Sequence, residues 1–141
     1  MPACENHNAG VIVRVPLDEG GLTGSITPES KFEEGDFRNS YFRDNRKREV
    51  YERVQNIASD LDISVDRMAE TSLRYVLSHP AVSTVIPGMR SIRNVERNCQ
   101  AGDGQGLPQE QVDKLKSHRW FATFIKHKAG CIVRTLSCVK I

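Results

Sequence analysis

The sequence predicts an α/β fold in which a long, helical crossover joins two short parallel strands. Residues 11–15 and 82–86 are apolar runs rich in β-branched side chains, which is typical of parallel strands. Between these runs, apolar residues recur at spacings of three and four after Asn45 and again after Ser64, and this period predicts two helices. A further helical period follows the second strand.

The composition limits the function classes that need to be considered. The chain has 141 residues, which is room for one domain, with 38% hydrophobic and 27% charged residues. A net charge of +2 is too small to indicate nucleic acid or a membrane surface as the main partner. The apolar run at residues 11–15 contains Arg14 and is too short for a signal peptide or a membrane span. We therefore expect a cytoplasmic protein.

The first ten residues are polar and are expected to be irregular, and the first strand follows them. That strand ends at Pro16-Leu-Asp-Glu-Gly-Gly-Leu-Thr-Gly24, where three glycines allow a tight loop with exposed amides. Local physical chemistry favours a surface turn here, with Asp18 and Glu19 as solvated charges and not as an acid/base pair.

The crossover begins with residues 25–44, which show no sustained period and contain several aromatic side chains, as in loops that cover a ligand. The helix after Asn45 is expected to bury one apolar face, made of Val50, Val54, Ile57 and Leu61. Ser64 is the predicted cap of the second helix. The apolar stripe of that helix is Met68, Ala69, Leu73, Val76 and Leu77.

The second strand turns sharply into a helix whose predicted N-cap is Ser91. The free N–H groups and the positive dipole end of such a helix suit an anion. Gly88 allows a ligand to approach the backbone, and Arg90 adds a forked charge suited to phosphate. Strand–turn–helix units are common, so this shape alone leaves a structural turn and a phosphate site both open.

The residues of this turn resemble a known family. Ile86-Pro-Gly-Met-Arg-Ser-x-x-x-Val-Glu-Arg-Asn98 is similar to the segment of the aldo-keto reductases that holds the 2′-phosphate and adenine of NADPH. The resemblance implies that Arg90 contacts the 2′-phosphate and Asn98 the adenine edge, whereas Arg97 stands where an acidic residue is frequent. The cofactor residues that it implies here are Gly88, Met89, Arg90, Asn94, Arg97 and Asn98.

Other segments are similar to the same family. The loop after the first strand resembles the loop after the seventh barrel strand, and the helix at residues 67–80 resembles the next barrel helix. In the loop, the positions whose backbone would line the cofactor pyrophosphate are Pro16, Leu17, Gly20 and Leu22. The resemblance implies that residues 1–120 are the C-terminal portion of a (β/α)8 TIM barrel, with its last two strands and their helices, and hence an incomplete barrel.

No catalytic residue is assigned. In the family, an Asp, Tyr, Lys and His quartet lies on earlier strands, and no matching motif surrounds Tyr41, Tyr51 or Tyr75. The resemblance therefore implies the NADP(H)-binding part of an enzyme that interconverts carbonyl compounds and alcohols by hydride transfer, with this chain itself inactive. Residues 121–141 are β-prone and unlike the family, and read-through into unrelated sequence is our hypothesis for this tail.

Two alternatives come from other classes of protein. The chain could be a non-enzymatic module that pairs its bare strands with a complementary barrel half or with itself. It could also bind nucleic acid through the basic residues 43–49, or zinc through a set of cysteines and histidines. Acidic residues interrupt the basic run, which favours a solvated helix face, and the spacing of the zinc set matches no common site. That set is His118, His127, Cys131 and Cys138.

Overall fold

Two strands, β1 (Val11–Arg14) and β2 (Val82–Ile86), pair in parallel, as the sequence predicts. The structure is a computed structural model that describes residues 1–120, so the predicted tail at 121–141 lies outside the described residues. Val13 pairs with Val85 and Arg14 with Ile86, after an irregularity in the register. Because the strands are parallel, the segments that follow them leave from the same carboxyl edge.

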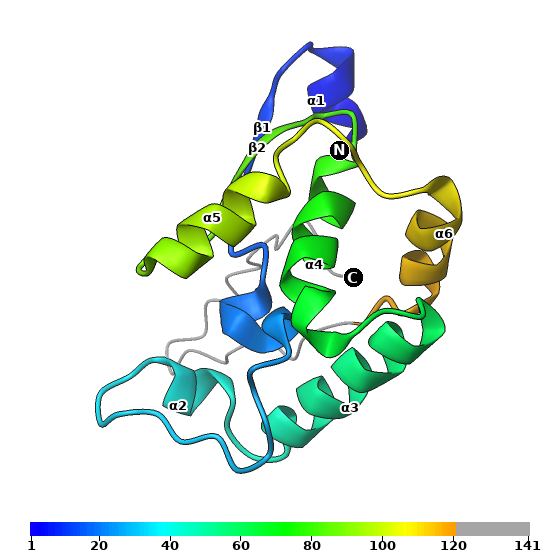
Figure 1. Ribbon diagram of the computed structural model, residues 1–141. Coiled ribbons are helices and arrows are strands. Elements are labelled where there is room, and N and C mark those ends of the chain that lie inside the picture. The colour runs from blue at the N-terminus through cyan, green and yellow to red at the C-terminus, as the bar shows by residue number, and fades with distance from the viewer. Residues whose placement is uncertain (121–141) are drawn as a thin grey trace.

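The crossover between the strands consists of two longer helices preceded by short turns (Figure 1). Its elements are η1 (Asp18–Thr23), α2 (Arg38–Tyr41), α3 (Arg46–Asp60), η2 (Val65–Arg67) and α4 (Met68–Leu77). After β2 the chain forms α5 (Ile92–Gln100) and α6 (Gln109–Ser117). Within residues 1–120, no helix is long and apolar enough to cross a membrane.

The core lies where α3, α4 and α6 meet the loop that precedes α3. The predicted inner face of α3 is confirmed, because its four apolar residues are 1–6% exposed. The α4 stripe is confirmed for Met68, Leu73 and Val76, at 0–1% exposure, whereas its other two residues, Ala69 and Leu77, are half-buried. The main cluster of buried residues is Ile26, Phe42, Val50, Val54, Ile57, Ala58, Leu61, Met68 and Leu115.

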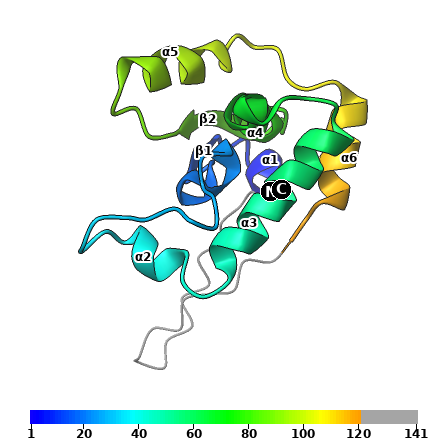
Figure 2. The same cartoon turned by 60° about the horizontal axis from the view of Figure 1, so that its bottom comes forward.

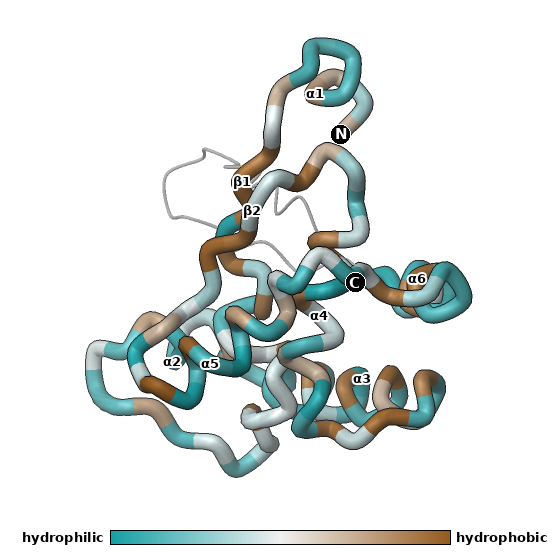
Figure 3. Tube along the Cα trace, turned by 45° about the horizontal axis from the view of Figure 1, so that its top comes forward, coloured by the Kyte–Doolittle hydropathy of each residue, from teal (hydrophilic) through white to brown (hydrophobic). Residues whose placement is uncertain are grey.

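The strand pair and α5 lie outside this cluster, although Val13 of β1 is buried, at 5% exposure. Ile12 in β1 is 67% exposed and Ile86 in β2 is 56% exposed, although the strands carry the hydrophobic colour in Figure 3. Helix α5 has no buried residue, and Ile92 is 79% exposed. Figures 1 and 2 both place α5 and α2 on the side of the strand pair opposite α6.

Three local expectations are wrong. The first residues form a short helix, α1 (Pro2–Asn6), whose proline stands at the position where it suits a helix start. The first strand ends at Arg14, because Val15 has φ 55° and leaves the extended region. The hydroxyl of Ser64 donates to the carboxylate of Asp66 and does not cap a backbone amide.

Candidate functional site

The candidate site lies at the carboxyl edge of the strand pair. Residues 15–24 continue β1, and residues 87–98 continue β2, from the paired ends Arg14 and Ile86. In open sheets of parallel strands, ligands bind beyond this edge. The topology therefore brings together the two segments that the sequence singles out.

The backbone after β1 is strained. Val15, Asp18 and Glu19 have φ of 55°, 50° and 56°, which is the left-handed region that non-glycine residues rarely occupy. Each such residue costs on the order of 1–3 kcal/mol, and strain of this kind clusters at functional sites. Gly20 follows at φ 95°, and a Cβ added there would meet nothing within 4 Å. A ligand could thus approach the backbone closely at this glycine.

The predicted pyrophosphate residues occupy this strained loop, but two of their amides are engaged within it. The N–H groups of Gly20 and Leu22 donate to the carbonyl of Leu17, at 3.0 and 3.1 Å. Pro16 is buried, and the side chain of Leu22 packs against the core. In this conformation these two N–H groups are used within the loop and are not free to bind an anion.

The turn after β2 is closed by side chains of α5. The backbone N–H of Asn94 donates to the Ser91 hydroxyl at 3.2 Å, which confirms Ser91 as the N-cap. The Asn98 side-chain amide donates to the Gly88 carbonyl, also at 3.2 Å. A Cβ added at Gly88 would meet nothing within 4 Å, so its outer side is open. This turn leaves Met89 44% exposed.

The two basic residues predicted in this segment have different surroundings. Arg90 is exposed on the turn, whereas Arg97 lies 3.9 Å from Asp66 in an exposed ion pair. An ion pair of this type contributes little to stability, so it holds Arg97 only weakly.

Charges from the crossover lie around Arg90. Hydrogen bonds from Arg38, with smaller contributions from the charges of Arg38 and Arg90, lower the pKa of Asp36 to about 2. The pKa of Arg38 is raised chiefly by its hydrogen bond to Asp36, with a contribution from the charge of Glu19. The loop at residues 25–44, the loop after β1 and the turn after β2 therefore influence one another electrostatically.

A polar cluster holds η1 against α2 and α3, and the sequence analysis misses it. The Tyr41 hydroxyl donates to Oδ1 of Asp18, and Arg46 Nη2 donates to Asp18 Oδ2 and to the Tyr41 oxygen, both at 3.2 Å. Burial raises the pKa of Tyr41, as do the charge and hydrogen bond of Asp18. The expectation that Asp18 is a solvated loop charge is wrong, because the fold brings it to partners 23 and 28 residues away.

The basic run at 43–49 is not entirely a solvated face. Arg46 is only 13% exposed in its side chain, and Lys47 donates to the Ser30 carbonyl at 2.7 Å. Of the residues in the zinc alternative, His118 bonds to Asp60 at 3.0 Å, and the other three lie outside the described residues. Residues 1–120 contain no group of three or more potential metal ligands.

Fold and site together define an α/β unit with a strained loop and a capped helix at the carboxyl edge of parallel strands. Residues 1–119 match the family described as "Aldo/keto reductase family", and the chain belongs to this family. The family resemblance drawn from the sequence is thereby confirmed.

Known relatives are longer than this chain. It is 32% identical over 120 residues to "Uncharacterized oxidoreductase YqkF" of Bacillus subtilis, covering 84% of this chain and 37% of that protein. It is 29% identical over 106 residues to "Aldo-keto reductase yakc [NADP(+)]" of Schizosaccharomyces pombe, covering 72% of this chain and 30% of that protein. The matched part of the chain thus spans about a third of each of these curated relatives, 37% and 30%.

Solved structures give the same picture. Aldo-keto reductase AKR11C1 from Bacillus halodurans, in its apo form, superposes with a TM-score of 0.59 and 26% identity, over 90% of this chain and 40% of that one. The glycerol dehydrogenase AKR11B4 from Gluconobacter oxydans gives a TM-score of 0.62 and 25% identity, over 88% and 40%. The two-stranded unit is consistent with part of the barrel fold of these proteins.

Proposed function

We propose that this chain is the C-terminal, NADP(H)-binding part of an aldo-keto reductase fold. The observation that carries the proposal is the joint exit, at one sheet edge, of the strained loop after β1 and the capped turn that presents Arg90. Open space beside Gly20 and Gly88 fits the close approach of a dinucleotide to the backbone. The relative from Schizosaccharomyces pombe, whose name includes NADP(+), supports the choice of cofactor.

In this proposal the two segments grip opposite ends of the dinucleotide. Arg90 binds the 2′-phosphate through charge-assisted hydrogen bonds, and the N-terminus of α5 adds its positive dipole end. Asn98, already bonded to the Gly88 carbonyl, holds the turn against the adenine side. The residues assigned to the adenosine end are Gly88, Met89, Arg90, Asn94, Arg97 and Asn98, and those assigned to the pyrophosphate are Pro16, Leu17, Gly20 and Leu22.

The chemistry of the complete enzyme would be reduction of aldehydes or ketones to alcohols, or the reverse oxidation. When bound, NADP(H) supplies or accepts the hydride. The described residues hold and orient the dinucleotide, and we assign none of them to proton transfer. We accordingly expect this chain alone to show no carbonyl reduction with NADPH.

Fluorescence titration of the full chain with NADPH and NADH tests the proposal. Replacing Arg90 by Ala should weaken NADPH binding by about 1.5–3 kcal/mol, because a charge-assisted phosphate contact is lost, and should leave NADH binding nearly unchanged. Arg93→Ala, which removes the same charge from the exposed part of α5, is the matched control. Equal affinity of the unaltered chain for both nucleotides would contradict the role of Arg90.

A second candidate is an interaction module, and the exposure of the strands favours it. Ile12 and Ile86 present apolar surface on a two-stranded sheet whose outer edges have no partner strand within residues 1–120. A polypeptide that supplies complementary barrel strands, or a second copy of this chain, would cover this surface. Sedimentation of the chain alone, and mixed with the N-terminal half of a relative, distinguishes these partners from a monomer.

A further inference from the structure

Helix α5 is not held in place by burial. None of its residues is buried, and the apolar side chains of Ile92 and Val95 are 79% and 38% exposed. At the N-terminal end of α5, the Ser91 hydroxyl accepts from the Asn94 N–H. This bond lies within one segment, so it fixes the shape of the turn but does not attach α5 to the rest of the fold. Directly after the helix, Ala101 is 2% exposed. The placement of α5 therefore depends on contacts at its C-terminal end.

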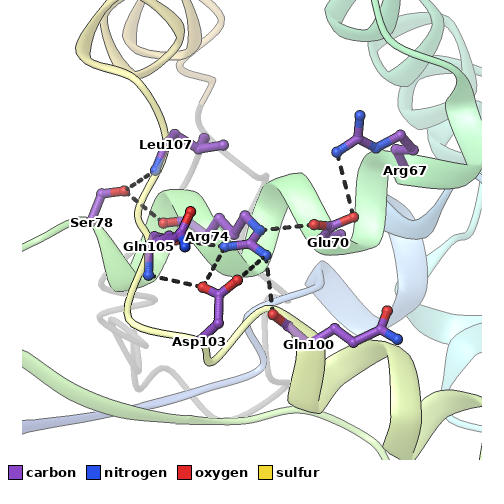
Figure 4. Close-up of polar contacts among 8 residues, drawn as sticks. All are labelled: Arg67, Glu70, Arg74, Ser78, Gln100, Asp103, Gln105 and Leu107. Atoms are coloured by element: carbon purple, nitrogen blue, oxygen red, sulfur yellow. Dashed lines mark hydrogen bonds and ion pairs between the residues drawn. The ribbon is translucent and has the colours of Figure 1, made fainter.

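One side chain of α4, Arg74, makes several contacts at this end of α5 and with the loop that follows it. Arg74 is 15% exposed, and all five of its N–H donors have acceptors (Figure 4). Nε donates to Glu70 at 2.8 Å, within α4. Nη1 and Nη2 each donate to one Asp103 oxygen at 2.8 Å, which is a bidentate pair. The remaining donors reach the carbonyls of Gln100, at 3.0 Å, and Gln105, at 2.6 Å.

These bonds suit the end of a helix. Gln100 is the last residue of α5, where carbonyls lack partners within the helix and the dipole is negative. A guanidinium supplies both the donors and the opposite charge. Asp103 then fixes the guanidinium, and its pKa is lowered to about 2 chiefly by the hydrogen bonds from Arg74.

A second tie joins the same loop to α4. The Ser78 hydroxyl donates to the Arg74 carbonyl at 2.7 Å and accepts from the Leu107 N–H at 3.0 Å (Figure 4). The loop between α5 and α6 is thus bonded to α4 at several points, with Arg74 at the centre.

We infer that Arg74 is a positioning residue for the dinucleotide site: from the buried helix α4 it fixes the C-terminal end of α5, and so orients the turn that carries Arg90. The part of this inference that concerns the dinucleotide rests on the proposed function. Its structural part, that Arg74 holds α5, stands on the contacts alone.

The test compares Arg74→Met with Arg67→Met in the full chain. Both changes remove one positive charge, but Arg67 is 58% exposed and lies 3.7 Å from Glu70, away from the loop after α5. Hydrogen exchange measures whether α5 loosens, and titration with NADPH and NADH measures nucleotide preference. For Arg74→Met we expect exchange in α5 to be faster by about tenfold or more, with a comparable loss of NADPH preference and unchanged protection in α3. Arg67→Met should stay within about twofold on both measures.

Asp103→Asn is the second variant, should Arg74→Met fail to fold. This change weakens the bidentate pair between Arg74 and Asp103 at its exposed partner. Hydrogen exchange in α5 should become faster, by a smaller factor than in Arg74→Met, and the preference for NADPH over NADH should fall. If α5 exchange and nucleotide preference in these variants match Arg67→Met, the inference is overturned. If the unaltered chain does not distinguish NADPH from NADH, the proposed function fails, and α5 exchange alone still decides whether Arg74 holds the helix.

Discussion

The packed helices and the strand–α5 region of this chain differ in what holds them. In α3, α4 and α6, apolar side chains such as Val54, Met68 and Leu115 are 0–2% exposed. In the strands and α5, several side chains of the same type are exposed, as Ile12, Ile86 and Ile92 show, whereas Val13 of β1 is buried. Burial at about 25 cal/mol per Å² therefore stabilises the first region more than the second, and hydrogen bonds and ion pairs place α5, which has no buried residue.

The difference explains how the candidate site is held at the edge of a two-stranded sheet. The helices α3 and α4, whose apolar faces are buried, carry Arg46 and Arg74 respectively. From there, polar bonds reach out to the loop after β1 and to α5. Segments held by few buried contacts belong to the low-stability end of a structure, where ligand-binding loops are common.

The comparison is sharpest for two side chains of equal size. Leu115→Ala should lower the free energy of unfolding by about 2–5 kcal/mol, because Leu115 is 0% exposed and its removal leaves a cavity. Ile92→Ala, at 79% exposure, should change it by less than about 0.5 kcal/mol. Urea unfolding followed by circular dichroism measures both. A large cost at Ile92 would break the comparison and show that α5 is covered in solution.

The cluster at Tyr41 lies between the two regions and should give an intermediate effect. Tyr41→Phe should cost about 1–3 kcal/mol near neutral pH, because the Asp18 carboxylate, 20% exposed, loses a donor. Tyr75→Phe is the control, since the Tyr75 hydroxyl has no hydrogen-bond partner within residues 1–120. Chemical denaturation of the three proteins at one pH gives the ranking, and equal stability of the two variants would show that the Tyr41 bond is not formed.

The same pair of variants has a distinct pH dependence. The folded protein raises the pKa of Tyr41 above its ordinary value of 10.0, so above that pH the unfolded chain releases a proton that the folded chain retains. This contribution to stability is complete below pH 10 and is lost as the pH rises. Stability at alkaline pH should fall more steeply in the unaltered chain and in Tyr75→Phe than in Tyr41→Phe. Parallel curves for all three would contradict the raised pKa.

What the sequence predicts well is what local patterns encode. The two strands, the inner face of α3, the stripe of α4 and the Ser91 cap all follow from spacing and residue type over short stretches. The family of the chain is predicted from a run of residues around Pro87 and Gly88, and the family match over residues 1–119 confirms it.

The sequence does not predict the contacts between residues that are distant along the chain. Nothing in the spacing of Asp18, Tyr41 and Arg46 places them together, and Arg74 looks like an ordinary polar residue of a helix. The left-handed backbone of Val15 is not predicted either. A β-branched residue favours a strand, yet the first strand ends just before Val15. Roles in nucleotide binding stay predictions for every residue at the sheet edge, since the geometry gives an arrangement and not a bound ligand.

The smallest expected effect concerns acid. Hydrogen bonds from Arg74 and from the Gln105 N–H, with the charge of Arg74, lower the pKa of Asp103 from 3.8 to about 2. A lowered carboxylate pKa gives stability that is present above the ordinary value and is lost as the pH falls through the folded value. Melting temperatures of the unaltered chain should thus decline between about pH 4 and 2, and Asp103→Asn should flatten part of that decline.

Asp36 contributes to the rest of this acid dependence, because Arg38 lowers its pKa to about 2 as well. The pKa values of Asp66 and Asp113 are also lowered, chiefly by hydrogen bonds from Ser64 and Lys116, so these carboxylates contribute too. The contribution of Asp103 should be local, because this carboxylate is tied to the C-terminal end of α5 and not to the core. As the pH is lowered, hydrogen-exchange protection in α5 should therefore be lost at a higher pH than protection in α3. Loss of protection in both helices at one pH would mean that polar bonds and burial stabilise a single cooperative unit. In that case α5 depends on the packed helices as closely as they depend on one another, despite its exposed face.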